Sequence, residues 1–391
     1  MSKPQKLLAG LSLVAGAFAL LLWPQESTRA AKDGLMLCYN VILPSLFPFF
    51  VLSSLSVDLG FTRLFGRLLE PVMRPLFRIS GAGASAFALG CIGGYPVGAK
   101  TAVSLYESGQ CSRSEAHRLL AFCNNCGPAF LFGVVGVGVF GSSSIGLLLY
   151  GVHIAAALCV GIVFRFVGRP DISSSSYTVP PRSSSVRLST AFTGAVKNSF
   201  FNTLTICAFV VFFMVLIRLI AVSGLLTLLA NGLATLLSPF LGVSADWAHS
   251  FLAGLLEVST GVTSLSSGTL SLQLVTASFL LGWGGLSVHF QTLSIVGPSG
   301  LSSRTYFAGK ALHGLFSALL MAPLSKLIRT GVAVSFPIGE PLPTALTPYL
   351  HASVQHTLFL AAAFAIIALL FVLFSQKAMV KRRKLSYNKK K

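Results

Sequence analysis

The stretch Gly90-Cys91-Ile92-Gly93-Gly94-Tyr95-Pro96-Val97-Gly98-Ala99-Lys100 interrupts a long apolar region of the chain. Four glycines and one proline within eleven residues cannot continue a helix cheaply. Each flanking arm, at 82–88 and 101–106, is well short of the ~20 residues that a membrane span needs. In hydrocarbon, a broken backbone persists only where protein or water satisfies its N–H and C=O groups. The stretch therefore predicts two half-helices that meet at a Gly-Pro break, with a cytoplasmic glycine-rich turn as the alternative.

The composition is that of a membrane protein. Hydrophobic residues make up 54% of the 391 residues and charged residues only 10%, whereas soluble domains carry about a quarter charged residues. The net charge of +19 comes from basic residues at the ends of apolar runs, as the positive-inside rule expects, which argues against a nucleic-acid partner. The seven cysteines predict no disulfide framework, and no second pair of ligands accompanies Cys123 and Cys126. We therefore expect neither a metal nor another cofactor.

The first part of the chain divides into an N-terminal region, 1–34, and a first repeat, 35–169. Residues 7–23 are expected to form a helix that the protein keeps, because no small-residue cleavage site follows, and an outer loop reaches to 34. Ser112 or Ser114 is expected to cap a helix. The repeat should hold, in order, a span at 35–57, an amphipathic helix pair at 58–80, the hairpin at 82–106, a broken span at 119–140 and a span at 145–167.

A Ser- and Pro-rich cytoplasmic linker at 170–189 precedes a second repeat at 190–330. The second repeat shows the same order, with a span at 198–220, an apolar segment at 225–241, a hairpin at 248–267, a broken span at 274–296 and a span at 305–328. Residues 331–391 hold an outer loop, a last span at 357–374 and a basic cytoplasmic tail. This order predicts an all-α polytopic membrane protein with inverted structural repeats, re-entrant helical hairpins and broken transmembrane helices.

Lysine and arginine residues set the expected orientation of the chain in the membrane. With both termini in the cytoplasm, 24 of the 29 basic residues fall in cytoplasmic segments, among which we count 297–310. In this orientation the first hairpin enters the membrane from the inside and the second from the outside. Insertion from opposite sides is what inverted repeats require.

Polar residues beside the breaks are candidates for substrate contacts. Asn124 and Asn125 precede a Gly-Pro pair inside an apolar run, which predicts either a ligand site or hydrogen bonds between helices. Glu257 is the acidic residue expected within the membrane. It either binds a coupling ion, H⁺ or Na⁺, or pairs with Lys100 or Lys310. Lys100 either meets an anionic substrate or extends toward the membrane surface.

Histidines complete the set of candidate polar residues. His289 lies beside a break in the second repeat, where it either relays a proton, donates to the substrate or only packs, and His153 and His313 face each other when the repeats are paired. No motif of a hydrolase, a metalloprotease or a phosphate-binding loop occurs, so an enzyme is not expected. The residues expected to contact the substrate are Gly93, Gly94, Tyr95, Pro96, Gly98, Lys100, Asn124, Asn125, Gly127, Glu257, Ser259, Thr260, Gly261, Gly284, Gly285, Ser287 and His289.

Four motifs carry a resemblance to a known family. They are Gly94-Tyr95-Pro96-Val97-Gly98-Ala99-Lys100, Phe122-x-Asn124-Asn125-x-Gly127-Pro128, Leu256-Glu257 and Gly284-Gly285-Leu286-Ser287-Val288-His289. Over about residues 35–330, the chain resembles the sporulation integral membrane protein family, which carries nucleoside-recognition (Gate) domains. Cys126 departs from the pattern, since serine or another small residue is expected there. More distantly, the chain is similar to concentrative nucleoside transporters and to the gate of ferrous-iron transporters.

The resemblance implies a role in endospore formation, in which dipicolinic acid moves from the mother cell across the outer forespore membrane. We therefore expect a multi-pass secondary transporter of a small organic anion. Its expected partners are that substrate, the lipid bilayer, a coupling ion and, if it assembles, further copies of the chain. The alternatives are a nucleoside-type transporter and a non-transporting membrane scaffold for assembly of the spore cortex or coat.

Overall fold

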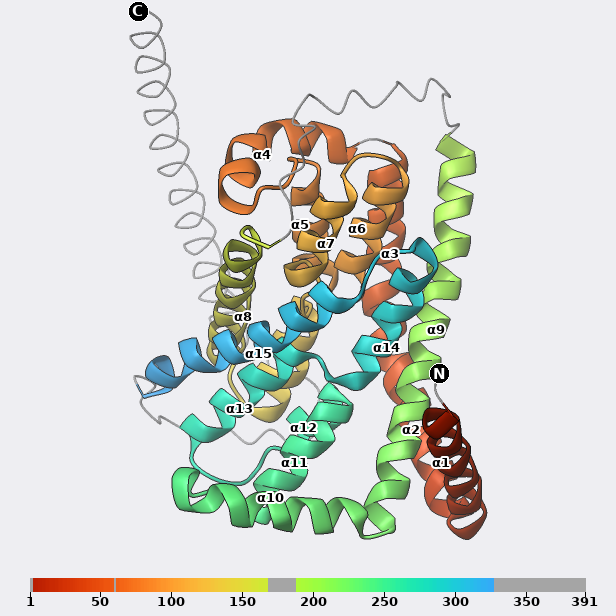
Figure 1. The fold of residues 1–391 in the computed structure, drawn as a ribbon, viewed down its shortest axis with the longest axis vertical. Helices are drawn as coiled ribbons and strands as arrows, with labels where there is room; N and C mark the ends of the chain where they lie inside the picture. Colours follow the sequence, from red (N-terminus) through yellow and green to blue (C-terminus); the bar gives the residue numbers. More distant parts are fainter. Residues whose placement is uncertain (1–2, 60, 168–187, 327–391) are drawn as a thin grey trace, which may run out of the picture.

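The computed structural model describes residues 3–59, 61–167 and 188–326, and this part of the chain is helical and contains no strand (Figure 1). The elements of the first half are α1 (Lys3–Leu22), α2 (Pro24–Leu37), the π-helical η1 (Cys38–Ile42), α3 (Leu43–Asp58), α4 (Phe61–Phe77), α5 (Gly83–Gly93), α6 (Val97–Glu107), α7 (Arg113–Phe122), the π-helical η2 (Ala129–Val139) and α8 (Ser143–Phe164).

The second half consists of α9 (Leu188–Val222), α10 (Leu225–Leu241), α11 (Ala245–Leu256), α12 (Val258–Thr263), α13 (Leu270–Trp283), α14 (Gly285–Val296), the short 3₁₀ helix η3 (Gly297–Ser299) and α15 (Arg304–Ser325). The predicted hairpins and broken helices occur in the predicted order in both halves, and α8, α9 and α15 occupy the predicted spans at 145–167, 198–220 and 305–328. The segment at 35–57, predicted as one span, consists of the end of α2, η1 and α3. Almost all of the predicted linker at 170–189, and everything predicted for 331–391, lies outside the described residues.

Two predictions about the first half are wrong. Residues 24–34 form most of α2 rather than an outer loop, with Pro24 at the first helical position, where its missing N–H costs nothing. The segment 58–80 contains one helix, α4, rather than a pair, because the helix continues through Pro71 and Pro75. A helix on a membrane surface can present the carbonyl groups that these prolines free to water.

Several helices are long and apolar enough to cross a membrane. Among the described residues there are four such segments, Ser143–Phe164, Leu188–Val222, Leu270–Ser299 and Arg304–Ser325, and a fifth if α10 and α11, which meet at a bend of 113°, form one broken span. The segment Leu270–Ser299 contains the break between α13 and α14. The chain is thus an integral membrane protein that crosses the bilayer several times.

The two hairpins lie toward opposite ends of the molecule. Helix α4 lies across one end of the long axis and α10 across the other, with the α5–α6 hairpin near α4 and the α11–α12 hairpin near α10 (Figure 1). The tips of both hairpins point to the middle, where α12 and α14 lie. This arrangement agrees with insertion from opposite sides, while the inverted relation of the two repeats stays a prediction.

Glycines allow the first hairpin to contact the broken helix α7–η2 backbone to backbone. A Cβ atom added at Gly90 or at Gly98 would lie only 1.9 Å or 1.8 Å from the carbonyl oxygen of Cys123. At the hairpin tip, Gly94 has a positive φ of 79°, and a Cβ there would lie 2.9 Å from the amide nitrogen of Gly127. Only glycine permits this approach, so these residues place the hairpin tip against the Asn124 segment.

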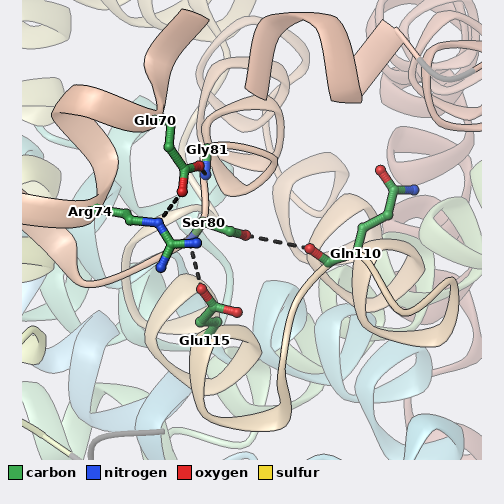
Figure 2. A network of polar contacts seen from close by, with 6 residues as sticks. All are labelled: Glu70, Arg74, Ser80, Gly81, Gln110 and Glu115. Atoms are coloured by element: carbon green, nitrogen blue, oxygen red, sulfur yellow. Dashed lines mark hydrogen bonds and ion pairs between the residues drawn. The ribbon is translucent and has the colours of Figure 1, made fainter. Parts of the chain in front are cut away.

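Two carboxylates hold the surface end of the hairpin in place (Figure 2). Glu115 accepts hydrogen bonds from the amides of Ser80, at 2.6 Å, and of Ser112, at 2.8 Å. The Ser112 hydroxyl accepts in return from the Glu115 amide at 3.2 Å, which completes the predicted cap of α7. Glu70 of α4 accepts from the Gly81 amide and pairs with Arg74. These contacts join α4, the start of the hairpin and α7.

The glycine contact can be tested with Gly98→Ala. We expect this change to lower the stability of the protein in detergent by about 3 kcal/mol, because the added methyl group forces α6 away from Cys123. Gly151→Ala is the matched control, since nothing lies within 4 Å of a Cβ there and alanine favours the helix. Equal unfolding midpoints for the two variants would show that the close approach is not needed.

The carboxylate contacts can be tested with Glu115→Ala. Loss of two hydrogen bonds to a buried charged group should lower the free energy of unfolding by about 3 kcal/mol. Glu107→Ala, at the exposed end of α6, should leave stability unchanged. Chemical unfolding in detergent measures both, and a Glu115→Ala protein as stable as the control would contradict the role given to this residue.

Candidate functional site

The two helix breaks of the first repeat lie against each other. The break between α5 and α6 is Gly94-Tyr95-Pro96, and the break between α7 and η2 runs from Cys123 to Pro128. The amide of Cys126, which has no helical partner there, donates to Nε2 of His153 at 2.9 Å. His153 lies on α8, and its ring centroid is 4.3 Å from that of His313 on α15, so the two histidines meet as the sequence predicted.

The two breaks of the second repeat also lie against each other. Glu257 separates α11 from α12, and Gly284 separates α13 from α14. Gly284 and Gly285 both have positive φ angles, of 92° and 78°. A Cβ at Gly285 would lie 3.0 Å from the amide nitrogen of Val258, so the two breaks are in backbone contact.

Residues from both halves join the two pairs of breaks. Cys126, Val258 and Val288 belong to one buried apolar cluster, against which Tyr95 packs. The carboxylate of Glu257 is close enough to the Tyr95 hydroxyl for the two to interact electrostatically. The tips of the two hairpins and the two broken helices therefore meet in the apolar interior.

Asn124 takes part in a buried hydrogen-bond network with α14 and α15. Its amide nitrogen donates to the hydroxyl of Thr292 at 3.0 Å, and the Tyr306 hydroxyl donates to the same oxygen at 3.2 Å. Nδ1 of His289 lies 2.9 Å from the Tyr306 hydroxyl. Which of these two atoms donates depends on the tautomer of the imidazole. Nε2 of His289 is buried and has no partner within the described part of the chain.

Both asparagines keep one polar atom without a partner. The amide nitrogen of Asn125 donates to the carbonyl of Phe122 at 3.1 Å and to the thiol of Cys91 at 3.4 Å. The amide oxygens of Asn124 and Asn125 are buried and accept no hydrogen bond within the described part of the chain. Hydrogen bonds between helices account for the amide nitrogens of this pair but not for the oxygens, which favours a ligand site.

Glu257 caps the short helix α12. Its carboxylate accepts from the amides of Ser259, at 3.1 Å, and Thr260, at 2.7 Å, and from the Thr260 hydroxyl at 2.9 Å. Only 2% of the residue is exposed. Of the alternatives for Glu257, an ion pair with Lys310 does not occur among the described residues within the 4.0 Å limit for a salt bridge. The helix N-terminus supplies the positive charge instead.

The two lysines lie in different surroundings. The ammonium of Lys100 lies 5.0 Å from the ring centroid of Phe50 on α3, and its contact with a substrate stays a prediction. Lys310, which we counted in a cytoplasmic segment, is only 1% exposed and donates to the carbonyl of Asn124 at 3.1 Å. Lys310 falls inside the predicted span at 305–328, and a charged residue within a span indicates a buried position with a function. Our count of basic residues instead assigned Lys310 to the cytoplasmic segment 297–310.

Other predicted residues shape the breaks. A Cβ at Gly261 would lie 2.1 Å from the Cα of Gly254, so glycine lets α12 approach α11 closely. Ser287 is buried and accepts from the side chain of Gln291 at 3.2 Å. Gly93 ends α5, and Pro96 precedes the first residue of α6. In the described ranges, no group of three His, Cys, Asp or Glu side chains is placed to hold a metal ion.

Comparisons with known proteins cover most of the chain. Residues 40–164 match the Gate family model, described as nucleoside recognition. A solved structure of a doubly substituted CNTnw in an outward-facing state superposes on 83% of this chain and 86% of its own, with 14% identity and a TM-score of 0.44. The sporulation integral membrane protein YlbJ of Bacillus subtilis (strain 168) is 33% identical over 328 residues, which are 78% of this chain and 79% of that protein. The chain therefore belongs to the family of the sporulation integral membrane protein YlbJ and carries a Gate domain.

Proposed function

We propose that this protein is a secondary transporter of a small organic anion, and that the anion is dipicolinic acid, moved across the outer forespore membrane during sporulation. The observation that carries this proposal is the meeting of four helix breaks around buried amide oxygens that have no partner, those of Asn124 and Asn125. Broken helices around polar groups at membrane depth are typical of substrate sites in transporters.

The helix N-termini at this site favour a negatively charged substrate. Four other helices, α7, α8, α11 and α13, begin with a serine or threonine side chain that accepts a backbone hydrogen bond. At the breaks, α6 begins after Pro96 and α14 after Gly284, and neither has a side-chain cap, as is also the case for α2, α5, α10 and α15. Uncapped helix N-termini carry partial positive charge, which suits a carboxylate.

The other groups at this site have the chemistry to contact an aromatic ring of the substrate and to bind a coupling cation. Tyr95 at the first break offers an aromatic face to a planar substrate. The carboxylate of Glu257 and the free amide oxygens of Asn124 and Asn125 are the kind of ligands that H⁺ or Na⁺ requires. A dicarboxylate moving together with such a cation would leave less net charge to cross the hydrocarbon.

A nucleoside is the second candidate substrate, because the matched family is described as nucleoside recognition. Purified protein in liposomes separates the two. We expect uptake of labelled pyridine-2,6-dicarboxylate that excess unlabelled dicarboxylate inhibits and uridine or adenosine does not, since uncapped helix N-termini favour anions. Uptake that nucleosides block and dicarboxylates leave unchanged would support the second candidate and refute the first.

The polar residues can be tested in the same liposomes. Asn124→Ala and Glu257→Gln should each reduce uptake at least about tenfold, because each removes a group that faces the substrate or its coupling ion. Asn231→Ala on the exposed face of α10 and Glu107→Gln at the exposed end of α6 are the matched controls and should transport normally. Normal uptake by both site variants would refute the proposed site, provided that their amounts in the membrane equal those of the controls.

A further inference from the structure

We propose that Lys310 selects anionic over neutral substrates, with its ammonium group binding one carboxylate of the transported molecule. This inference rests on the proposed transport function and names the chemistry that its site requires. It concerns a residue of α15 that lies outside all four helix breaks but beside three of them.

The described part of the chain supplies no counter-charge to Lys310. The residue is 1% exposed, and its ammonium donates to the Asn124 carbonyl at 3.1 Å. Within residues 3–59, 61–167 and 188–326, no carboxylate forms an ion pair with it under the 4.0 Å limit. A lysine buried in this way is costly, and an apolar side chain would fill the space more cheaply. Such a charge indicates a partner that arrives from outside the chain.

The neighbouring ionisable groups supply no negative charge to Lys310. Glu257 has its carboxylate bound by three hydrogen bonds at the start of α12. His153, His289 and His313 are near enough to Lys310 to interact electrostatically, and an imidazole is either neutral or positive. Nε2 of His153 accepts a hydrogen bond from Cys126, so its buried and unpartnered Nδ1 carries a proton. His153 thus offers a second donor to an anion.

Lys310 lies where the breaks of both repeats meet. Its ammonium is 5.5 Å from the ring centroid of Tyr95 in the first break and is bonded to Asn124 in the second. A Cβ at Gly284, in the fourth break, would lie 3.6 Å from its Cε. An ammonium has three donors, and the Asn124 carbonyl uses one of them. The other two can bind a carboxylate whose ring lies near Tyr95, whereas a neutral nucleoside has no group that needs this charge.

The proposal can be tested by calorimetric titration of the full-length protein in detergent with two probes, pyridine-2,6-dicarboxylate and the neutral pyridine-2,6-dicarboxamide. Wild type should bind the dicarboxylate far more tightly than the diamide. Lys310→Met should weaken dicarboxylate binding about 100-fold and leave diamide binding unchanged, since only one probe needs the charge. Lys326→Met, exposed at the end of the same helix, is the matched control and should bind as wild type does.

Thermal unfolding without ligand separates this role from a structural one. Lys310→Met should unfold at the same temperature as wild type or higher, because it removes an unpaired buried charge. Lys310→Gln keeps a donor for the Asn124 carbonyl and should show the same loss of dicarboxylate binding.

The outcomes distinguish this inference from the transport proposal. If wild type binds the dicarboxylate and both Lys310 variants bind it equally well, Lys310 is not the selecting residue, although the transport proposal stands. If neither variant folds, the lysine is structural and the inference is refuted. If wild type binds neither the dicarboxylate nor any other small anion, the proposed function fails as well.

Discussion

The structure depends on the need to satisfy backbone groups wherever a helix is interrupted inside an apolar protein. Each interruption finds partners in its immediate surroundings. The carbonyl of Cys123 lies against Gly90 and Gly98, the amide of Cys126 bonds to His153, and Glu257 caps α12 with its own carboxylate. The breaks also lie against one another at glycines, and this brings polar residues of both repeats close together.

The polar groups that remain without partners give this place its chemistry. The interior satisfies the amide nitrogens of Asn124 and Asn125 but not their oxygens, and it buries Lys310 without a carboxylate. A protein that needed only stability would avoid such groups, since each one costs free energy of folding. Membership in a sporulation membrane-protein family with a Gate domain agrees with a site built for a ligand rather than for packing.

Much of the fold could be predicted from local chemistry. The Gly-Pro stretch at 94–96 and the Gly284–Gly285 pair cannot continue a helix, so both breaks were visible in the sequence. The cap of α7 was visible as a serine followed three residues later by Glu115. The predictions failed where charged residues were assumed to lie in loops outside the membrane. The region at 24–34 was expected to be a loop, and Lys310 was assigned to the cytoplasm with other basic residues.

The sequence by itself determined that this chain crosses a membrane, where its helices break and which polar residues lie beside the breaks, because glycine, proline and apolar length act locally. Only the tertiary structure decided which polar groups meet. In the tertiary structure Lys310, rather than Lys100, contacts Asn124. The carboxylate of Glu257 accepts hydrogen bonds from amides at the N-terminus of α12. These choices depend on contacts between α7, α12 and α15, which are far apart in the chain, and no local pattern encodes such distances.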